Sequence, residues 1–373
     1  MNNNLIHCIT AAGLLLIVSP CSPEVAPADP AIDQALTSER CFGLIQSGRA
    51  LTPQQIVELT ARAAKNPADD EAVLPLIGHH HRGDKMKPEG AALLLGFVER
   101  HPRADGSGTL HIVLSFLYDI DTLKSAVRVW EKHAERFHDE PQVLGNAAQW
   151  MQHLAAVEPA YSKEALMLLE RARSLEPKAL RWALLLGMAS LDAASKQTPP
   201  QNAETANKAI AALEASLTLG DAAGRDLLLA GKGPVEAALA EARFITGDLT
   251  KAKSDAETAL TKLDPKKDSW NHGNLDFALH QLLGRIALAQ GDGKEAAAQL
   301  IASGKTPGSP QLNSFGPSMS LASELLGKGE RKAVVEYLDL CAKFWSSGRS
   351  KMPDWKSQIE KGETPDFGPN ASR

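Results

Sequence analysis

The stretch from Asn146 to Pro177 reads NAAQWMQHLAAVEPAYSKEALMLLERARSLEP. In its second half a small residue, a bulky apolar residue four positions on and another small residue three further on occur as Ala165, Leu169 and Ala172. Positions four and seven residues after a starting point return to the same face of an α-helix. The triplet therefore predicts the buried stripe of a helix.

The same triplet recurs along the chain at intervals of 38 to 44 residues. A further close-packing residue precedes three of the triplets by twelve positions, at Ala240, Gly284 and Ala322. A helix pattern that repeats over this length predicts an array of stacked helix pairs, because one pair alone cannot bury its apolar stripe. The later triplets are Ala209/Leu213/Ser216, Ala252/Ala256/Ala259, Ala296/Leu300/Ser303 and, more loosely, Val334/Leu338/Cys341.

A glycine followed by an acidic residue stands just before three of these triplets, as Gly247-Asp248, Gly291-Asp292 and Gly329-Glu330. Glycine readily takes the left-handed conformation that ends a helix, and an acidic residue is favourable at the positive N-terminus of the next helix. The spacing predicts a tight turn between the two helices of each pair.

This combination resembles the tetratricopeptide repeat, and the resemblance covers roughly Leu110 to Trp345. The chain departs from the family because Ala, Ser or Leu fills the tyrosine position and most aromatic positions, and because its period exceeds the usual value of about 34 residues. The resemblance implies an all-α fold, a right-handed solenoid of antiparallel helix pairs. The extra length lies in an insertion around Ser195–Asn202 and in linkers at Leu219–Pro234, Asp264–Asn274 and Thr306–Pro317.

The repeats, at 109–346, are expected to follow an N-terminal helical cap at 39–108. Within the cap, Thr52-Pro53-Gln54-Gln55 predicts a capped helix start, and another helix is expected over Pro88–Glu99. A pair of helices is expected on either side of Asp119-Ile120-Asp121, with Ala126 and Trp130 buried. Residues 347–373 are expected to form a helix and a tail that is loosely held from Gly362 onward.

Residues 1–28 have the character of an export signal and a linker rich in Pro and Ala. Leu5–Val18 contains no charged side chain and is too short to span a bilayer comfortably, but it fits the apolar segment of a secretory signal. Val18-Ser19-Pro20-Cys21 resembles the lipobox of bacterial lipoproteins, which implies acylation of Cys21. The alternative is an ordinary signal cut after Ala28, and a third is an uncleaved cytoplasmic start.

The expected location is therefore the bacterial periplasm or cell envelope, with membrane contact only through a lipid on the N-terminus. A formal charge of -5, with 40 basic and 45 acidic residues and no basic block, argues against nucleic acid as a partner. If Cys8 leaves with the signal and Cys21 carries lipid, Cys41 and Cys341 remain. They are expected either to pair in an oxidising envelope or to act as compact hydrophobic residues.

No pattern in the sequence predicts a metal, a cofactor or a catalytic centre. The cysteines lack the spacing of a thiolate site, and the consecutive His79-His80-His81 cannot all face one metal because neighbours on a helix point about 100° apart. Ser303-Gly304-Lys305-Thr306 resembles the end of a phosphate-binding loop, but Gln299 stands where that motif needs its first glycine. We therefore expect a protein that is not an enzyme.

In the family that the chain resembles, the inner helix of each pair lines a concave groove that binds a protein or peptide. By register this implies partner contacts from Trp150, Arg181, Gln281 and Arg285, with His272 entering the same row. The alternatives are a ligand-binding sensor or accessory subunit of an envelope enzyme complex, with a small ligand at His272 and His280, and a cytoplasmic scaffold. The linker Pro307–Pro317, in which turn residues frame Leu312 and Phe315, is expected to be a packed connector or a second contact surface.

Overall fold

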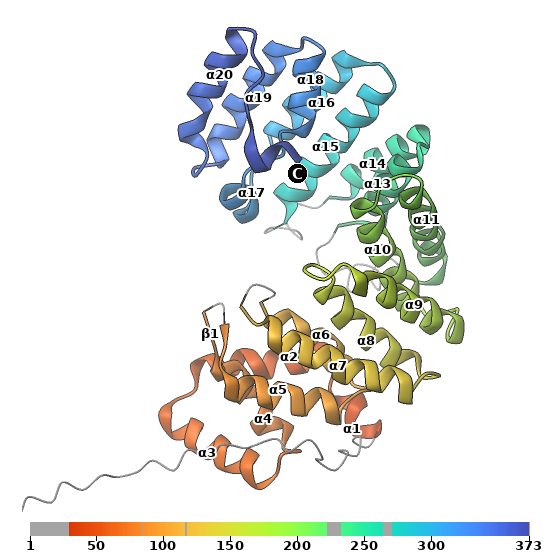
Figure 1. Cartoon of the computed structure of the whole chain (residues 1–373), viewed down its shortest axis with the longest axis vertical. Helices are drawn as coiled ribbons and strands as arrows, with labels where there is room; N and C mark the ends of the chain where they lie inside the picture. The colour runs from red at the N-terminus through yellow and green to blue at the C-terminus, as the bar shows by residue number, and fades with distance from the viewer. Residues whose placement is uncertain (1–29, 84, 116–117, 222–232, 264–270, 373) are drawn as a thin grey trace, which may run out of the picture. The chain divides into compact units, whose positions relative to one another are not determined.

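The structure, a computed structural model, describes residues 30–83, 85–115, 118–221, 233–263 and 271–372. The expected signal segment with Cys21, and Trp270 in the linker, lie outside these residues. The chain forms two compact units, Met1–His81 with Lys87–Ser107 and Arg82–Met86 with Gly108–Arg373. The described part of the chain is helical apart from a two-stranded ribbon of β1 (His81–Arg82) and β2 (Lys85–Met86), which confirms the all-α prediction (Figure 1).

The first unit is built around α4 (Asp70–His80), which packs against α2 (Ser38–Ser47), α3 (Pro53–Lys65) and α5 (Pro88–Arg100). The predicted capping box begins α3: the Gln55 amide donates to Thr52 Oγ1 at 3.3 Å, and the Thr52 amide donates to Gln55 Oε1 at 2.9 Å. The remaining elements that begin here are α1 (Pro30–Ala35), η1 (Gly48–Ala50) and α6 (Asp105–Thr109).

In the second unit, neighbouring helices pack consecutively from α7 to α16, and the packing continues through α18, α19 and α20 (Figure 1). Helices that do not follow one another directly also touch, as α10 with α13, α13 with α15 and α15 with α18. The unit therefore has the repeat-like character that the triplets predict. Its elements are η2 (Leu110–Val113), α7 (Ile120–Arg136), α8 (Pro141–Leu154), α9 (Ala160–Leu175), α10 (Leu180–Lys196), α11 (Gln201–Leu219), α13 (Val235–Thr246), α14 (Leu249–Lys262), α15 (His272–Ala289), α16 (Gly293–Gly304), α17 (Pro310–Phe315), α18 (Ser320–Gly327), α19 (Arg331–Phe344), η3 (Arg349–Lys351), α20 (Met352–Glu360) and η4 (Gly368–Ser372).

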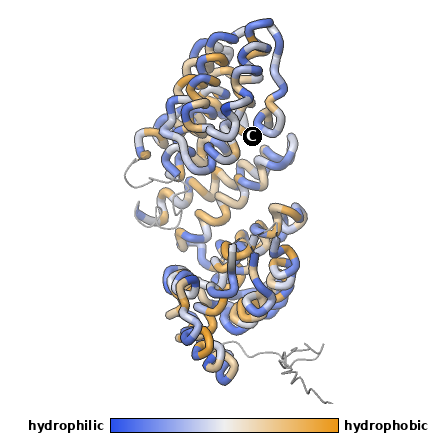
Figure 2. Tube along the Cα trace, turned by 90° about the vertical axis from the view of Figure 1, so that its left-hand side faces the viewer, coloured by the Kyte–Doolittle hydropathy of each residue, from blue (hydrophilic) through white to orange (hydrophobic). Residues whose placement is uncertain are grey.

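All five triplets are buried, and each lies on its own helix, namely α9, α11, α14, α16 and α19. Every triplet residue exposes 1% of its surface or less. In Figure 2 hydrophobic and hydrophilic residues alternate along the helices, as expected where one face of each helix packs against its neighbours. The prediction that the triplets mark buried helix stripes is confirmed.

The predicted glycine turns are also confirmed. Gly247, Gly291 and Gly329 have φ values of 83°, 84° and 86°, a conformation that costs other residues steric strain. The side chain of Asp248 accepts a hydrogen bond from the Lys251 amide, and that of Asp292 accepts one from the Glu295 amide. The turns at Gly247 and Gly291 thus end one helix and cap the next within two residues, whereas Glu330 after Gly329 makes no side-chain cap.

The prediction of a helix before Asp119 is wrong, although Ala126 and Trp130 are buried on α7 as expected. The short helix α6 and the 3-10 turn η2 stand in its place. The Asp119 carboxylate accepts hydrogen bonds from the amides of Met86 at 2.9 Å and Ser115 at 3.0 Å. These bonds fix Met86 and Ser115 to the residue that precedes α7, where the sequence led us to expect a helix.

The prediction of a loosely held C-terminal tail is also wrong for its described residues. Phe367 is buried against Trp355, with ring centroids 5.0 Å apart. Asn370 Nδ2 donates to the carbonyl oxygens of Phe315 and Pro317, each at 3.0 Å, and the Met319 amide donates to the Asn370 carbonyl at 2.8 Å. The tail is therefore part of the last hydrophobic core.

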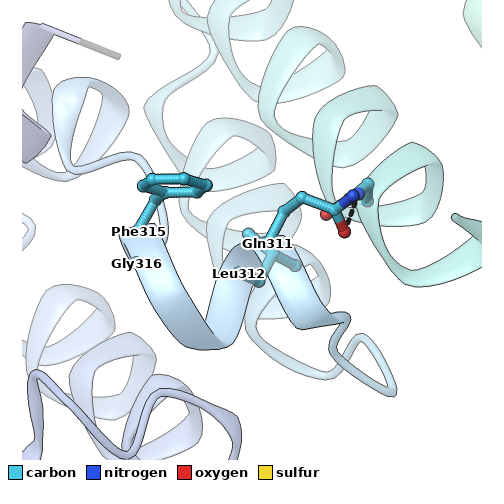
Figure 3. Close-up of a pocket in the computed structure, with 5 residues that line it drawn as sticks. Gln311, Leu312, Phe315 and Gly316 are labelled. Carbon is cyan, nitrogen blue, oxygen red and sulfur yellow. Dashed lines mark hydrogen bonds between the residues drawn. The ribbon is translucent and has the colours of Figure 1, made fainter. Parts of the chain in front are cut away.

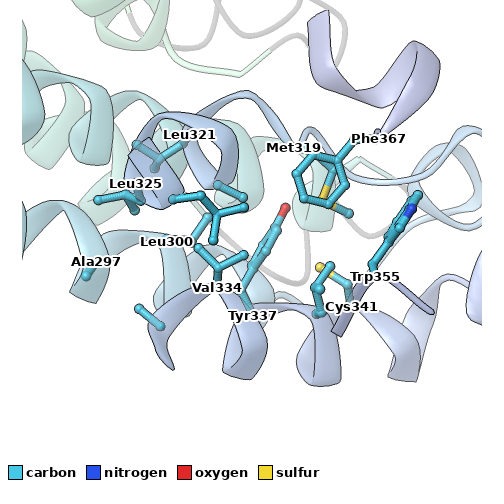
Figure 4. Close-up of a cluster of buried hydrophobic side chains, with 14 of the residues drawn as sticks. Ala297, Leu300, Met319, Leu321, Leu325, Val334, Tyr337, Cys341, Trp355 and Phe367 are labelled. Atoms are coloured by element: carbon cyan, nitrogen blue, oxygen red, sulfur yellow. The ribbon is translucent and has the colours of Figure 1, made fainter. Parts of the chain in front are cut away.

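That core joins α16, α18, α19 and α20 with Phe367 of the tail (Figure 4). Tyr337 and Cys341 of α19 lie in its centre, where Cys341 fills a small-residue position of the repeat as a compact apolar group. No helix among the described residues is both long and apolar enough to cross a bilayer.

Candidate functional site

Arg285 is the most connected exposed side chain among the residues predicted to contact a partner. It lies on α15, with its guanidinium carbon 4.9 Å from the centre of the Phe244 ring on α13. On its other side its Nε atom is 3.8 Å from Glu324 Oε1 on α18. Because both partners of the Glu324 pair are nearly half exposed, the pair contributes little to stability. The arrangement instead places an aromatic ring, a cation and a carboxylate on one surface.

Glu241 of α13 belongs to the same surface. Its side chain is exposed to solvent, but the pKa of its carboxyl is raised. The largest cause is desolvation by the surrounding protein, and the negative charge of Asp192 on α10 acts in the same direction. The positive charge of Arg285 acts in the opposite direction and lowers the pKa. Asp192 itself is paired with Lys196 at 2.8 Å. Charged side chains of α10, α13, α15 and α18 therefore interact electrostatically from one helix of this surface to the next.

Arg181 extends this row toward α8. Its Nη1 atom donates to Gln142 Oε1 of α8 at 2.6 Å, and its guanidinium carbon lies 4.4 Å from the centre of the Trp182 ring. The indole of Trp182 is fixed in turn, since its Nε1 donates to Glu176 Oε2 at 2.7 Å. We call the resulting row the first-helix face; it comprises Gln142, Arg181, Asp192, Glu241, Phe244, Arg285 and Glu324.

Trp150 and Gln281 do not lie on this face, which corrects their assignment as partner contacts. Trp150 is fully buried, and its ring centroid lies 6.5 Å from that of Trp130 and 6.0 Å from that of His111. Gln281 is 7% exposed, and its Nε2 donates to Ser303 Oγ at 2.8 Å. Both side chains contribute to packing between helices, because a buried group has no surface to offer a partner.

His272 and His280, both on α15, also have structural surroundings. His280 Nδ1 lies 2.7 Å from Gln299 Oε1, and its Nε2 lies 3.8 Å from Asp276 Oδ1. His272 is half-buried at the start of the helix, and its Nδ1 has no hydrogen-bond partner among the described residues. Nothing in this arrangement brings the two imidazoles to one ligand.

The two cysteines of the described chain, Cys41 and Cys341, are free and buried. Burial raises the pKa of Cys41 to about 12 and also raises the pKa of Cys341. The thiolate is the reactive form of cysteine, so neither side chain is an activated nucleophile. Across residues 30–372, leaving out the gaps, no three His, Cys, Asp or Glu side chains converge as metal ligands.

Sequence reasoning missed Glu241, Phe244 and Glu324. A signal for Glu241 was present: it follows Leu239-Ala240 just as Arg285 follows Leu283-Gly284, so the two residues occupy equivalent positions in their repeats. Phe244 is three residues further along α13, on the same side of the helix. Glu324 has no comparable signal, because only the packing of α18 beside α15 brings it to Arg285.

Comparison with models of known protein families gives no match for this chain, and no curated protein matches its sequence significantly.

Proposed function

We propose that this protein is a non-catalytic scaffold that binds a protein or peptide along the first-helix face. In this proposal the helices of the second unit form a right-handed solenoid of antiparallel pairs, similar to that of tetratricopeptide repeats. The helices α8, α10, α13, α15 and α18 are the first members of their pairs. The contacts of α10 with α13, α13 with α15 and α15 with α18, and the hydrogen bond from Arg181 of α10 to Gln142 of α8, support the proposal, because a row of equivalent helices offers a partner one continuous surface.

The observation that carries the proposal is the position of Arg285 between Phe244 and Glu324, which come from the helices on either side of α15. Arginine and aromatic side chains contribute most of the binding energy at many protein interfaces. Here the ring orients the guanidinium while leaving it exposed, so less conformational entropy is lost when a partner binds. Arg181, which is half-buried, stacks on Trp182 and donates to Gln142, so α10 carries a second arginine held against an aromatic ring.

The geometry favours this face over a small-ligand site at His272 and His280. His280 is already engaged by Gln299 and Asp276, so a ligand would have to displace those partners. At the first-helix face Arg285 is exposed, so a partner can reach its guanidinium without displacing the Phe244 ring.

Affinity capture from an envelope extract tests the function. The bait proteins are the full chain, an Arg181→Glu/Arg285→Glu variant and an Arg171→Glu/Lys294→Glu variant that makes the same change in charge on α9 and α16. We expect the first variant to lose the partner and the second to keep it. Equal recovery of the same proteins by all three baits would contradict the assignment of the first-helix face.

Export is the second part of the proposal: the chain carries a signal that ends either before Cys21 or after Ala28. Mass spectrometry of the N-terminus of the native protein distinguishes the alternatives. A lipidated Cys21 indicates a lipoprotein, and a free terminus at Asp29 indicates an ordinary secreted protein. An intact Met1 would contradict export and favour a cytoplasmic scaffold.

A further inference from the structure

An open cavity of about 360 Å³ lies where α17 meets α15, and nothing in the proposed function uses it (Figure 3). It is lined by Asn274 of α15, by Gln311, Leu312 and Phe315 of α17, and by Gly316. Phe315 is 61% exposed, whereas Leu312 on the same short helix is buried. This volume is at the small end of the range for ligand pockets, so it suits one large side chain better than an extended cofactor.

Hydrogen bonds at both ends of the short helix α17 hold it in place, so the exposed position of Phe315 is fixed by the fold. Ser309 caps the helix by accepting the Leu312 amide at 3.0 Å and also donates to Asn274 Oδ1. At the other end, Asn370 of the tail holds the Phe315 carbonyl at 3.0 Å.

The turn that follows α17 is equally constrained. Gly316 has a φ of 83°, and a Cβ atom there would collide with the Trp345 ring. An exposed aromatic ring on a rigid support loses little entropy when it is covered, so it is well suited to binding an apolar group.

The chemistry of the lining indicates what the cavity accepts. None of the described residues that line it is charged, and their polar side chains are carboxamides: Asn274 Nδ2 donates to Gln311 Oε1 at 3.1 Å. The exposed Gln311 amide retains N–H groups that can donate to a peptide carbonyl. A neutral apolar side chain next to a main-chain carbonyl matches these groups, whereas an ion or a phosphate finds no counter-charge among these five residues.

The cavity lies on the same helix as Arg285 of the first-helix face, and Ala278, between Asn274 and Arg285, is exposed. Asn274 and Arg285 lie eleven residues apart on α15, which is close to three full turns, so they share one side of the helix. At a rise of about 1.5 Å per residue they are roughly 16 Å apart along the helix axis, a length that about five residues of extended peptide cover.

We propose that the cavity between α15 and α17 is the anchor site for a large apolar side chain of an extended peptide that also contacts Arg285. This inference rests on the proposed function and adds the chemistry of the partner to it. The partner segment carries an aromatic or large aliphatic residue about five positions from the residue that meets Arg285.

Selection from a random dodecapeptide library displayed on phage, with the full chain as target, tests the inference. We expect the recovered peptides to share an aromatic or large aliphatic residue. Synthetic copies should bind a Phe315→Ser variant about thirtyfold more weakly, as for an interface residue whose contact dominates binding. The matched control is Met167→Ser on α9, which removes an apolar side chain of nearly equal exposure, 59%, and should leave affinity unchanged.

The same peptides separate this inference from the function beneath it. Peptides that bind Phe315→Ser as tightly as the native chain but fail to bind Arg181→Glu/Arg285→Glu overturn the anchor site and leave the first-helix face intact. Peptides insensitive to both variants, or a selection that recovers none, overturn both. Because Phe315 is exposed, we expect circular dichroism to show the same helix content in Phe315→Ser and the native chain.

Discussion

His101 Nδ1 of the first unit lies 2.7 Å from Asp33 Oδ1, and both side chains are almost completely buried. The other ring nitrogen, Nε2, lies 3.1 Å from Asp70 Oδ1 at the start of α4. Asp33 belongs to α1 and also accepts the Arg103 amide at 3.2 Å. One imidazole thus connects α1, α4 and the end of α5. A neutral imidazole has a single N–H, so only the protonated ring can donate to both carboxylates.

We predict that the first unit is more stable in acid than in base over the range in which His101 titrates. Burial lowers the pKa of His101, but the hydrogen bonds with Asp33 and Asp70 outweigh burial and raise it above its ordinary value. The stabilisation is complete below the unfolded-state pKa of about 6.5 and is lost as the pH rises through the higher folded-state pKa. Denaturant unfolding at a series of pH values, followed by a probe in the first unit, measures this trend.

The matched variants are Asp33→Asn and His138→Gln. Asp33→Asn should lower the pKa of His101 in an NMR titration and destabilise the unit by about 3 kcal/mol, because it leaves a buried pair incomplete. His138 is exposed on the surface, and its replacement should leave the pH trend as it is. A first unit whose unfolding free energy rises with pH above 6.5 would refute the role given to His101.

The elements that sequence could predict are those with a local cause. The triplet on α14 and the turn at Gly247 each depend on residues within one or two helical turns, so periodicity and backbone preference are sufficient. The contact of His101 with Asp33 spans 68 residues and has no periodic signal. For the candidate site, register identified Arg285 but could not tell that Trp150 is buried, since burial depends on how neighbouring helices pack.

We predict that enlarging a triplet alanine destabilises the array. Ala256 is fully buried on α14, in a cluster with Leu279 and Leu283 of α15. Ala256→Leu should cost about 1 to 3 kcal/mol, because added methylene groups force their neighbours apart. Ala278→Leu, the same change at an exposed position of α15, should cost much less. Urea denaturation of both variants measures the difference, and equal losses would contradict close packing at Ala256.

We predict opposite effects for two glycine substitutions. A Cβ atom at Gly247 meets no other atom within 4 Å, so Gly247→Ala changes only the backbone energy at a φ of 83° and should destabilise by about 1 kcal/mol. Gly327 ends α18 with equally open surroundings and is not among the glycines with positive φ. Gly327→Ala should therefore be neutral or stabilising by up to about 1 kcal/mol. Thermal unfolding that ranks the two variants in the reverse order would refute the turn assignment.

We predict that Asn370 is required for the last core and for the position of α17. Its side chain is 6% exposed and satisfies the carbonyls of Phe315 and Pro317, so Asn370→Ala leaves both acceptors without that donor. A loss of about 1 to 3 kcal/mol is expected for such a change. The control is Ser314→Ala, at an exposed position of α17, which should be nearly neutral.

Amide hydrogen exchange measures where this loss occurs. Because the Asn370 carbonyl also accepts the Met319 amide, weakening the tail should increase exchange at the start of α18 and throughout α17. Exchange in α8 and α9 should not change, since those helices pack against each other and against α7 and α10, at the other end of the array from the tail. Unchanged exchange in α17 would mean that the tail only covers the core, and that Ser309 and Gly316 alone are sufficient to position Phe315.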